Sequence, residues 1–212
     1  HGNRRVVRID RQRHVTPIVD RFDGRRLNSP NDVVCRSDGR IYFSDPPYGL
    51  PKQDRDPGKE LPWNAVFMLA DGELHPLVTT HTRPNGLGFS PDEKAFYLAN
   101  SDPEHRYWMR YDVDRDGTLR DGVVFADVSR APEAGLPDGL KIDRLGHLFA
   151  TGPGGIWVFT PGGVHLGTIV LPEQPANLAW GDADWQTLYI TAQTALYRLR
   201  ALVDGQRLVY QE

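Results

Sequence analysis

Short apolar runs alternate with polar turns along almost the whole chain. The clearest case is residues 83–102, where an Asn-Gly pair leads into a short apolar strand, residues 90–94 form a polar turn, and the apolar run 95–99 follows. Clusters of Gly, Pro, Asn, Asp and Ser at such breaks favour turns. We find no amphipathic pattern of convincing helical length, so the sequence predicts an all-β protein.

The same hairpin pattern occurs four times, starting at Asn31, Asn85, Asp138 and Asn177. Successive starting points are 54, 53 and 39 residues apart. Repeats of four antiparallel strands at about this period are typical of a β-propeller, in which each repeat forms one blade. A β-sandwich with similar hairpins is the alternative, but a sandwich needs no polar residue at the same place in each unit.

The pattern predicts eighteen strands and one long loop, residues 46–64, which is rich in Pro, Gly and charge. The expected strands are residues 5–10, 14–22, 32–35, 41–44, 65–69, 74–79, 87–89, 95–99, 108–113, 123–128, 140–142, 147–150, 156–160, 164–170, 178–180, 187–191, 195–199 and 207–210.

A propeller brings the four repeat-starting residues together. The first strands of its blades line a central channel and run in the same direction, so we expect Asn31, Asn85, Asp138 and Asn177 at one mouth. Buried amide and carboxylate oxygens stay unpaired there unless a cation or water fills the centre. Oxygen donors suit a hard cation such as Ca²⁺ or Mg²⁺. An Asx turn is the alternative for each residue alone, and Asn177 differs in being followed by Leu.

Three stretches resemble the SMP-30/gluconolactonase family of six-bladed propellers, and its bacterial gluconolactonase branch most closely. They are residues 27–50, 83–102 and 136–155. The resemblance implies one divalent metal in the channel mouth, held by Asn85 and Asp138. It implies that Asn31 contacts the metal or the substrate, and that Asp138 is also the general acid/base. We expect the metal to be Ca²⁺, with Zn²⁺, Mg²⁺ or Mn²⁺ as alternatives.

The sequence departs from that family in one respect. The family's remaining ligand is a Glu in a Glu-Gly-Pro context near the start of the domain, and this sequence contains no such motif. We therefore expect residues 1–212 to be a single propeller domain of about four and a half blades, lacking the first blade and part of the second. The missing part would be on the order of 80 residues, and we expect the natural protein to have it.

The resemblance implies a metal-dependent lactonase that hydrolyses a gluconolactone-like sugar lactone to the aldonic acid. Asn31, Asp32, Tyr48 and Asn177 are the expected substrate contacts. Tyr48 is included because second strands end at the same mouth, which places the loop that follows beside the metal. The alternatives are a related metal-dependent esterase or organophosphate hydrolase, and a non-catalytic propeller that binds a partner.

Composition argues against several other functions. The net charge of −3 argues against nucleic-acid binding driven by phosphate attraction. No apolar run reaches the length of a transmembrane helix, so we expect a soluble protein, cytoplasmic or periplasmic. The sequence does not determine the oligomeric state. The single Cys35 excludes an intramolecular disulfide. The seven His share no repeat position, and no Gly-x-Ser-x-Gly elbow occurs, which argues against a His-based zinc site and a Ser nucleophile.

Overall fold

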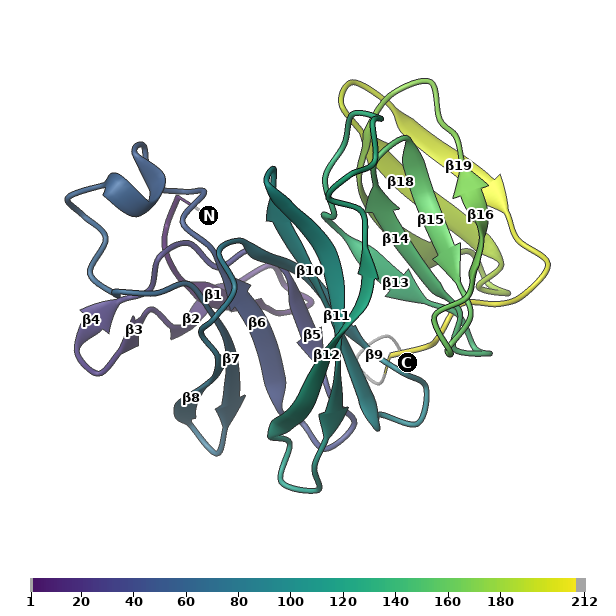
Figure 1. The fold of residues 1–212 in the computed structure, drawn as a ribbon. Coiled ribbons are helices and arrows are strands. Elements are labelled where there is room, and N and C mark those ends of the chain that lie inside the picture. Colours follow the sequence, from purple (N-terminus) through teal and green to yellow (C-terminus); the bar gives the residue numbers. More distant parts are fainter. Residues whose placement is uncertain (1, 209–212) are drawn as a thin grey trace.

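Regular structure is almost entirely β-strand in the computed structural model, which describes residues 2–208 (Figure 1). Within those residues the only helix is a single 3₁₀ turn, η1 (Gln53–Arg55). The strands are β1 (Val6–Ile9), β2 (Val15–Val19), β3 (Arg21–Phe22), β4 (Arg25–Arg26), β5 (Val33–Cys35), β6 (Ile41–Asp45), β7 (Ala65–Ala70), β8 (Glu73–Val78), β9 (Pro84–Phe89), β10 (Ala95–Asp102), β11 (His105–Val113), β12 (Leu119–Asp127), β13 (Leu140–Ile142), β14 (Leu148–Gly152), β15 (Gly155–Phe159), β16 (His165–Ile169), β17 (Pro175–Gly181), β18 (Thr187–Ala192) and β19 (Leu196–Arg200).

Each sequence repeat forms one antiparallel sheet. Strands β5–β8, β9–β12 and β13–β16 make three four-stranded sheets in chain order, and β17–β19 make a three-stranded one. The first strands of neighbouring sheets contact one another, β5 with β9, β9 with β13 and β13 with β17. The sheets therefore stand around a common axis with their first strands innermost, which confirms the expected all-β propeller architecture (Figure 1). The extent of the domain stays a prediction.

Two of the expected strands are not found as predicted. The run expected at residues 14–22 is divided at Asp20, whose carbonyl oxygen accepts a hydrogen bond from Leu27 N (3.0 Å). The chain there folds into the small β3–β4 hairpin, where Asp23 and Gly24 both have positive φ. The strand expected at 207–210 is absent at residues 207 and 208, and its remainder lies outside the described residues.

Strands β9 and β17 begin three residues before their expected starts. Pro84 pairs with Asn100 of β10, and Pro175 pairs with Ala192 of β18, so both ladders continue past an irregularity in register. Asn85 and Asn177 therefore lie inside strands rather than in the turns that precede them.

Aromatic and aliphatic side chains fill the spaces between neighbouring sheets. Trp108 has no exposed surface and packs against Phe159 in a cluster shared by the β9–β12 and β13–β16 sheets. Tyr42 packs on Phe89 and Phe96 between the β5–β8 and β9–β12 sheets. The core thus holds each sheet against the next, and this packing sets the relative positions of the first strands.

Candidate functional site

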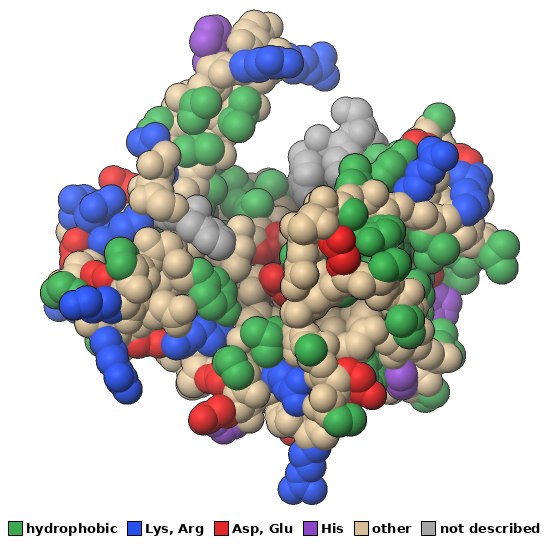
Figure 2. Space-filling view, turned by 90° about the horizontal axis from the view of Figure 1, so that it is seen from above, with side chains coloured by type: hydrophobic (Ala, Val, Ile, Leu, Met, Phe, Trp, Pro, Cys, Tyr) green, Lys and Arg blue, Asp and Glu red, His purple; other side chains and the backbone are tan. Residues whose placement is uncertain are grey.

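A hollow of about 330 Å³ opens where the first strands begin. Its lining residues come from the segments that start β5, β9, β13 and β17 and from the ends of the strands paired with them: Asn31, Tyr48, Asn85, Ser101, Leu136, Asp138 and Gln174. Figure 2, which views the molecule from above, shows this face hollowed near its centre with acidic side chains in the depression. The structure therefore brings together Asn31, Asn85 and Asp138, as the repeat predicted.

A chain of hydrogen bonds links these residues across the sheets. Asn31 Nδ2 donates to Asn85 Oδ1 (2.8 Å), and Asn85 Nδ2 donates to Ser101 Oγ (2.8 Å). Ser101 Oγ in turn donates to the carbonyl oxygen of Pro137, directly before Asp138. The polar wall of the hollow is therefore one connected network that joins three successive sheets.

Asp138 is the only charged residue that lines this hollow in the described part of the chain. Its backbone N–H donates to Thr151 Oγ1 (3.1 Å), which fixes the main chain just before β13. Burial and, to a smaller extent, the nearby charge of Asp32 raise the pKa of Asp138 to about 6, although a hydrogen bond from Asn85 partly opposes the rise. A carboxyl group with a pKa this close to neutral can exchange protons in general acid–base chemistry.

Two glycines allow the first strands to approach one another. Gly86 N donates to Asp138 O (3.1 Å), and Gly139 N donates to Ala176 O (2.9 Å). A Cβ at Gly86 would lie 2.9 Å from Gly139 Cα and even closer to the carbonyl oxygen of Asp138. Glycine after Asn85 and after Asp138 thus reflects strand packing around the axis, since neither glycine has a positive φ.

Tyr48 reaches the hollow from the long loop between β6 and β7. Burial raises the pKa of the Tyr48 hydroxyl, and interactions with Ser101 and Asn85 partly oppose that rise. Ser29 holds the start of the loop, because its Oγ donates to Pro46 O (2.5 Å) and accepts from Gly49 N (2.8 Å). The structure therefore places Tyr48 beside Asn85 and Asp138, where the sequence predicted it.

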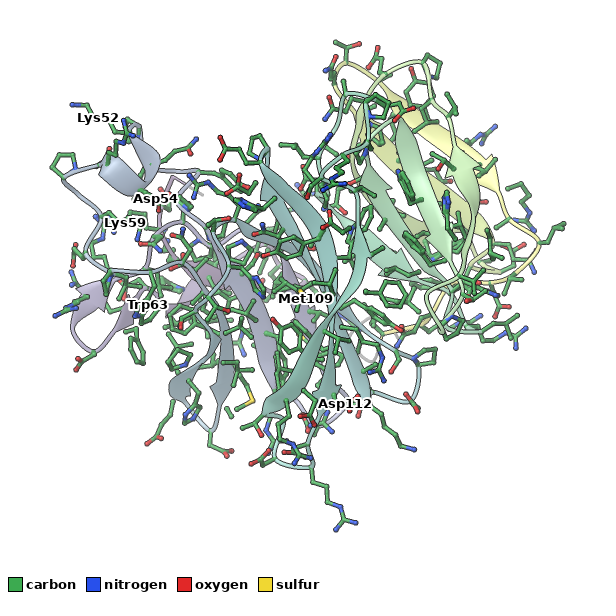
Figure 3. All side chains as sticks on the ribbon, viewed as in Figure 1. Lys52, Asp54, Lys59, Trp63, Met109 and Asp112 are labelled. Atoms are coloured by element: carbon green, nitrogen blue, oxygen red, sulfur yellow. The ribbon has the colours of Figure 1, made fainter. Side chains whose placement is uncertain are left out.

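The outer part of the same loop is tied to the β9 segment. Asp54 forms an ion pair with Arg83 (2.5 Å) and accepts a hydrogen bond from Asn64 Nδ2 (3.0 Å). Figure 3 shows Lys52, Asp54, Lys59 and Trp63 along the loop. The Lys59 side chain is 7% exposed, and its ammonium group donates to the carbonyl oxygens of Leu61 and Trp63. The loop is therefore anchored at several points close to the site.

Asp32 and Asn177 face a different hollow, which Lys141 and Tyr189 also line. Asp32 Oδ1 accepts a hydrogen bond from Val33 N (2.9 Å), and Asn177 Oδ1 accepts one from Leu178 N (2.8 Å). These local bonds resemble the turn-forming alternative. The structure does not bring either side chain into the hollow of Asn85 and Asp138, and their contact with substrate stays a prediction.

Ser101, Leu136 and Gln174 line the hollow and were not among the expected site residues. Ser101 lies near the end of β10, the second strand of its sheet, so the strand-direction argument that located Tyr48 could also have located it. Leu136 and Gln174 stand shortly before β13 and β17 and carry no distinctive motif.

The oxygen atoms around the hollow suit part of the coordination shell of a hard cation. Asn31 and Asn85 offer amide oxygens, Asp138 offers a carboxylate, and Asn85 Oδ1 keeps a lone pair beyond the one used by Asn31. Among residues 2–208 no group of three or more His, Cys, Asp or Glu is placed to hold a metal. The residues present therefore fit a Ca²⁺-like ion and do not fit a site of nitrogen and sulfur ligands.

The protein-family model of the SMP-30/Gluconolactonase/LRE-like region matches residues 2–194 of this chain. The chain belongs to this family. The resemblance seen in the three sequence stretches is therefore confirmed.

No helix among the described residues is long and apolar enough to cross a membrane.

Several of the similar proteins are lactonases by name. A gluconolactonase of Zymomonas mobilis is 40% identical over 96% of this chain and 59% of its own length. A pentonolactonase of Haloferax volcanii is 31% identical over 86% of this chain and 61% of its own length. The solved structure of a Xanthomonas campestris gluconolactonase superposes with a TM-score of 0.82 at 37% identity, covering 94% of this chain and 66% of that one. This chain spans about three fifths of the length of the two curated relatives.

Proposed function

We propose that this protein hydrolyses a sugar lactone to the corresponding aldonic acid with one bound divalent cation. The observation that carries the proposal is the meeting of Asn31, Asn85 and Asp138, from three successive sheets, in one hollow. The relatives named gluconolactonase and pentonolactonase support a sugar lactone as the substrate class.

Asp138 is the residue we assign to proton transfer. Its carboxylate takes a proton from the water that attacks the lactone carbonyl carbon. The bond between that carbon and the ring oxygen then breaks, and Asp138 returns the proton to the ring oxygen. In the cation-free protein, burial raises the pKa of Asp138 to about 6. A bound cation would lower this pKa, so the group would be ionised at neutral pH, in the form that accepts the proton from water.

Asn85 and Asp138, with Asn31, would hold the cation. When bound, such an ion polarises the lactone carbonyl as a Lewis acid and stabilises negative charge on its oxygen. We expect Ca²⁺, with Zn²⁺, Mg²⁺ or Mn²⁺ as alternatives, because the available donors are oxygens. Acting as ligand and base together requires that one Asp138 oxygen remain available to water.

Substrate hydroxyl groups would meet the remaining polar lining. The Tyr48 hydroxyl and the Asn31 and Gln174 amides line the same hollow as Asp138 and offer both donors and acceptors. The loop that carries Tyr48 borders the hollow, and its anchoring by the Arg83–Asp54 ion pair makes it a fixed wall for sugar selection.

The test is a substrate panel assayed before and after chelation. Gluconolactone, a pentonolactone, an aryl ester and a phosphotriester are incubated with protein treated with EDTA and then with Ca²⁺, Mg²⁺, Mn²⁺ or Zn²⁺. We expect metal-dependent turnover of the lactones above that of the aryl ester and phosphotriester. Preferred turnover of the phosphotriester would favour an organophosphate hydrolase, and no metal-dependent turnover of any substrate would favour a binding propeller.

A further inference from the structure

Ser101 sits at the centre of the polar network without being a candidate ligand itself. It belongs to β10, its side chain is almost fully buried at 4% exposure, and its hydroxyl contacts both the Asn85 side chain and the Pro137 carbonyl. Pro137 directly precedes Asp138. The Ser101 hydroxyl therefore contacts the Asn85 side chain and the residue directly before Asp138. We assign both Asn85 and Asp138 to cation binding.

The hydrogen-bond chemistry of Ser101 fixes the orientation of the Asn85 amide. A serine hydroxyl has one proton to donate, and a carbonyl oxygen can only accept, so the proton of Ser101 goes to Pro137 O. Towards Asn85 the hydroxyl can then only accept, which requires the NH₂ group of Asn85 to face it (2.8 Å). The reversed amide would set two acceptor oxygens against each other. Asn85 Oδ1 is therefore held on the opposite side, beside Asn31.

Hydroxyl groups near the ends of the second strands in the two flanking sheets make different hydrogen bonds. Ser44 Oγ accepts from the backbone N–H of Asp32 (3.1 Å), and Thr151 Oγ1 accepts from the backbone N–H of Asp138 (3.1 Å). Both fix the main chain at the start of a first strand. Ser101 instead holds a ligand side chain, so its loss would leave that side chain free to turn.

We propose that Ser101 is a positioning residue that keeps the Asn85 amide oxygen directed to the cation and ties Asn85 to the Asp138 segment. This inference rests on the proposed function, because it concerns the same cation. It predicts that removal of the hydroxyl weakens cation binding through the orientation of Asn85, in addition to any cost in folding stability.

The test is a calorimetric titration of purified protein with Ca²⁺ alone, so that the readout does not depend on catalysis. Ser101→Ala should bind Ca²⁺ about 10-fold to 100-fold more weakly than wild type, the usual cost of losing a hydrogen bond that orients a ligand. Ser90→Ala is the matched control. Ser90 lies at the other end of the β9–β10 hairpin, where its hydroxyl also donates one hydrogen bond, to Asp92 Oδ1, and accepts one, from Ala95 N. This control should bind Ca²⁺ as wild type does.

A second pair of variants isolates the orientation effect. Asp in place of Asn85 presents an oxygen on both sides of its carboxylate, so its orientation no longer matters. In the Asn85→Asp background the Ser101→Ala change should therefore weaken Ca²⁺ binding by less than about 3-fold, and the double-mutant cycle should show strong coupling. Urea unfolding of each variant verifies that it is folded before titration.

The outcomes separate the inference from the proposed function. If wild-type protein binds none of Ca²⁺, Mg²⁺, Mn²⁺ and Zn²⁺, both are overturned. If wild type binds Ca²⁺ and Ser101→Ala binds it equally well, the inference alone is overturned. If Ser101→Ala weakens binding equally with Asn85 and with Asp at that position, Ser101 acts only through general packing, and the inference is likewise wrong.

Discussion

Gly86 is the position where a single methyl group should disable the site without changing the side chain of any candidate ligand. An alanine Cβ there would lie 2.9 Å from Gly139 Cα, whereas ordinary contacts of a Cβ begin at 3.4 Å. The same Cβ would lie even closer to the carbonyl oxygen of Asp138. The strands β9 and β13 must therefore separate by more than 0.5 Å, the difference between those two distances.

The consequences of Gly86→Ala can be estimated in size. Overpacking of this kind costs about 1–3 kcal/mol of unfolding free energy. Weakening the hydrogen bond from Gly86 N to Asp138 O (3.1 Å) costs about 1 kcal/mol more. Because Asn85 and Asp138 lie on the two strands that move apart, we expect lactonase kcat/KM to fall by about 10²-fold, the usual effect of a misplacement near 1 Å.

The assay combines gluconolactone turnover, followed with a pH indicator, and urea unfolding of the same preparation. Gly162→Ala is the control, because a Cβ at Gly162 meets nothing closer than 3.8 Å. That variant should keep its activity and lie within about 0.5 kcal/mol of wild type in stability. Gly86→Ala protein with wild-type kcat/KM would refute the view that strand proximity at this glycine sets the site.

Three further predictions concern stability and the loop. Burial lowers the pKa of His81 to about 4, and an unfolded histidine binds a proton below about 6.5. The unfolded chain therefore binds the extra proton between these values, so the contribution of His81 to stability should fall as pH drops from 6.5 to 4, by up to about 1.4 kcal/mol per pH unit. Urea unfolding of wild type and His81→Gln at several pH values should show this contribution as a difference between the two proteins that changes with pH. Trp108→Ala should lower the unfolding free energy by about 3–5 kcal/mol, because the indole is fully buried between two sheets; a loss below about 1 kcal/mol in urea unfolding would contradict that packing. Asp54→Ala removes the partner of Arg83 and should raise KM for lactones while lowering stability by less than about 1 kcal/mol; unchanged KM would show that the ion pair does not shape the site.

The turns and apolar runs were sufficient to predict the propeller. Polar breaks such as those at Gly39, Gly72 and Gly117, all of which have positive φ, mark the hairpins in the sequence as they do in the structure. The repeat also predicted the meeting of Asn31, Asn85 and Asp138, because equivalent positions in equivalent strands face the same mouth. Both results depend on local chemistry repeated at a regular period.

The parts that could not be predicted depend on contacts between distant segments. Asn177 Oδ1 accepts a hydrogen bond from the backbone N–H of the next residue, Leu178, instead of facing the hollow. The residues packed around Asn177 decide between these two orientations, and the identity of the residue as Asn does not predict which is adopted. The division of the strand at Asp20 depends on a hydrogen bond from Leu27, seven positions along the chain. Ser101 is one of six serines in the sequence, and only its two hydrogen-bond partners in space distinguish it.

Turnover by Asp138→Asn protein is the measurement that tests the central claim most directly. The substitution keeps the shape of the side chain and one ligand oxygen, but removes the charge and the base. We expect gluconolactone turnover to fall by at least ~10²–10⁴-fold and to stay low at saturating Ca²⁺, because added metal cannot replace a base. Asp143→Asn is the control at the other end of the β13–β14 hairpin, where Asp143 bonds to its own turn and to His147. Near-wild-type turnover by Asp138→Asn at ordinary metal concentration would contradict the assignment of Asp138 as the catalytic base.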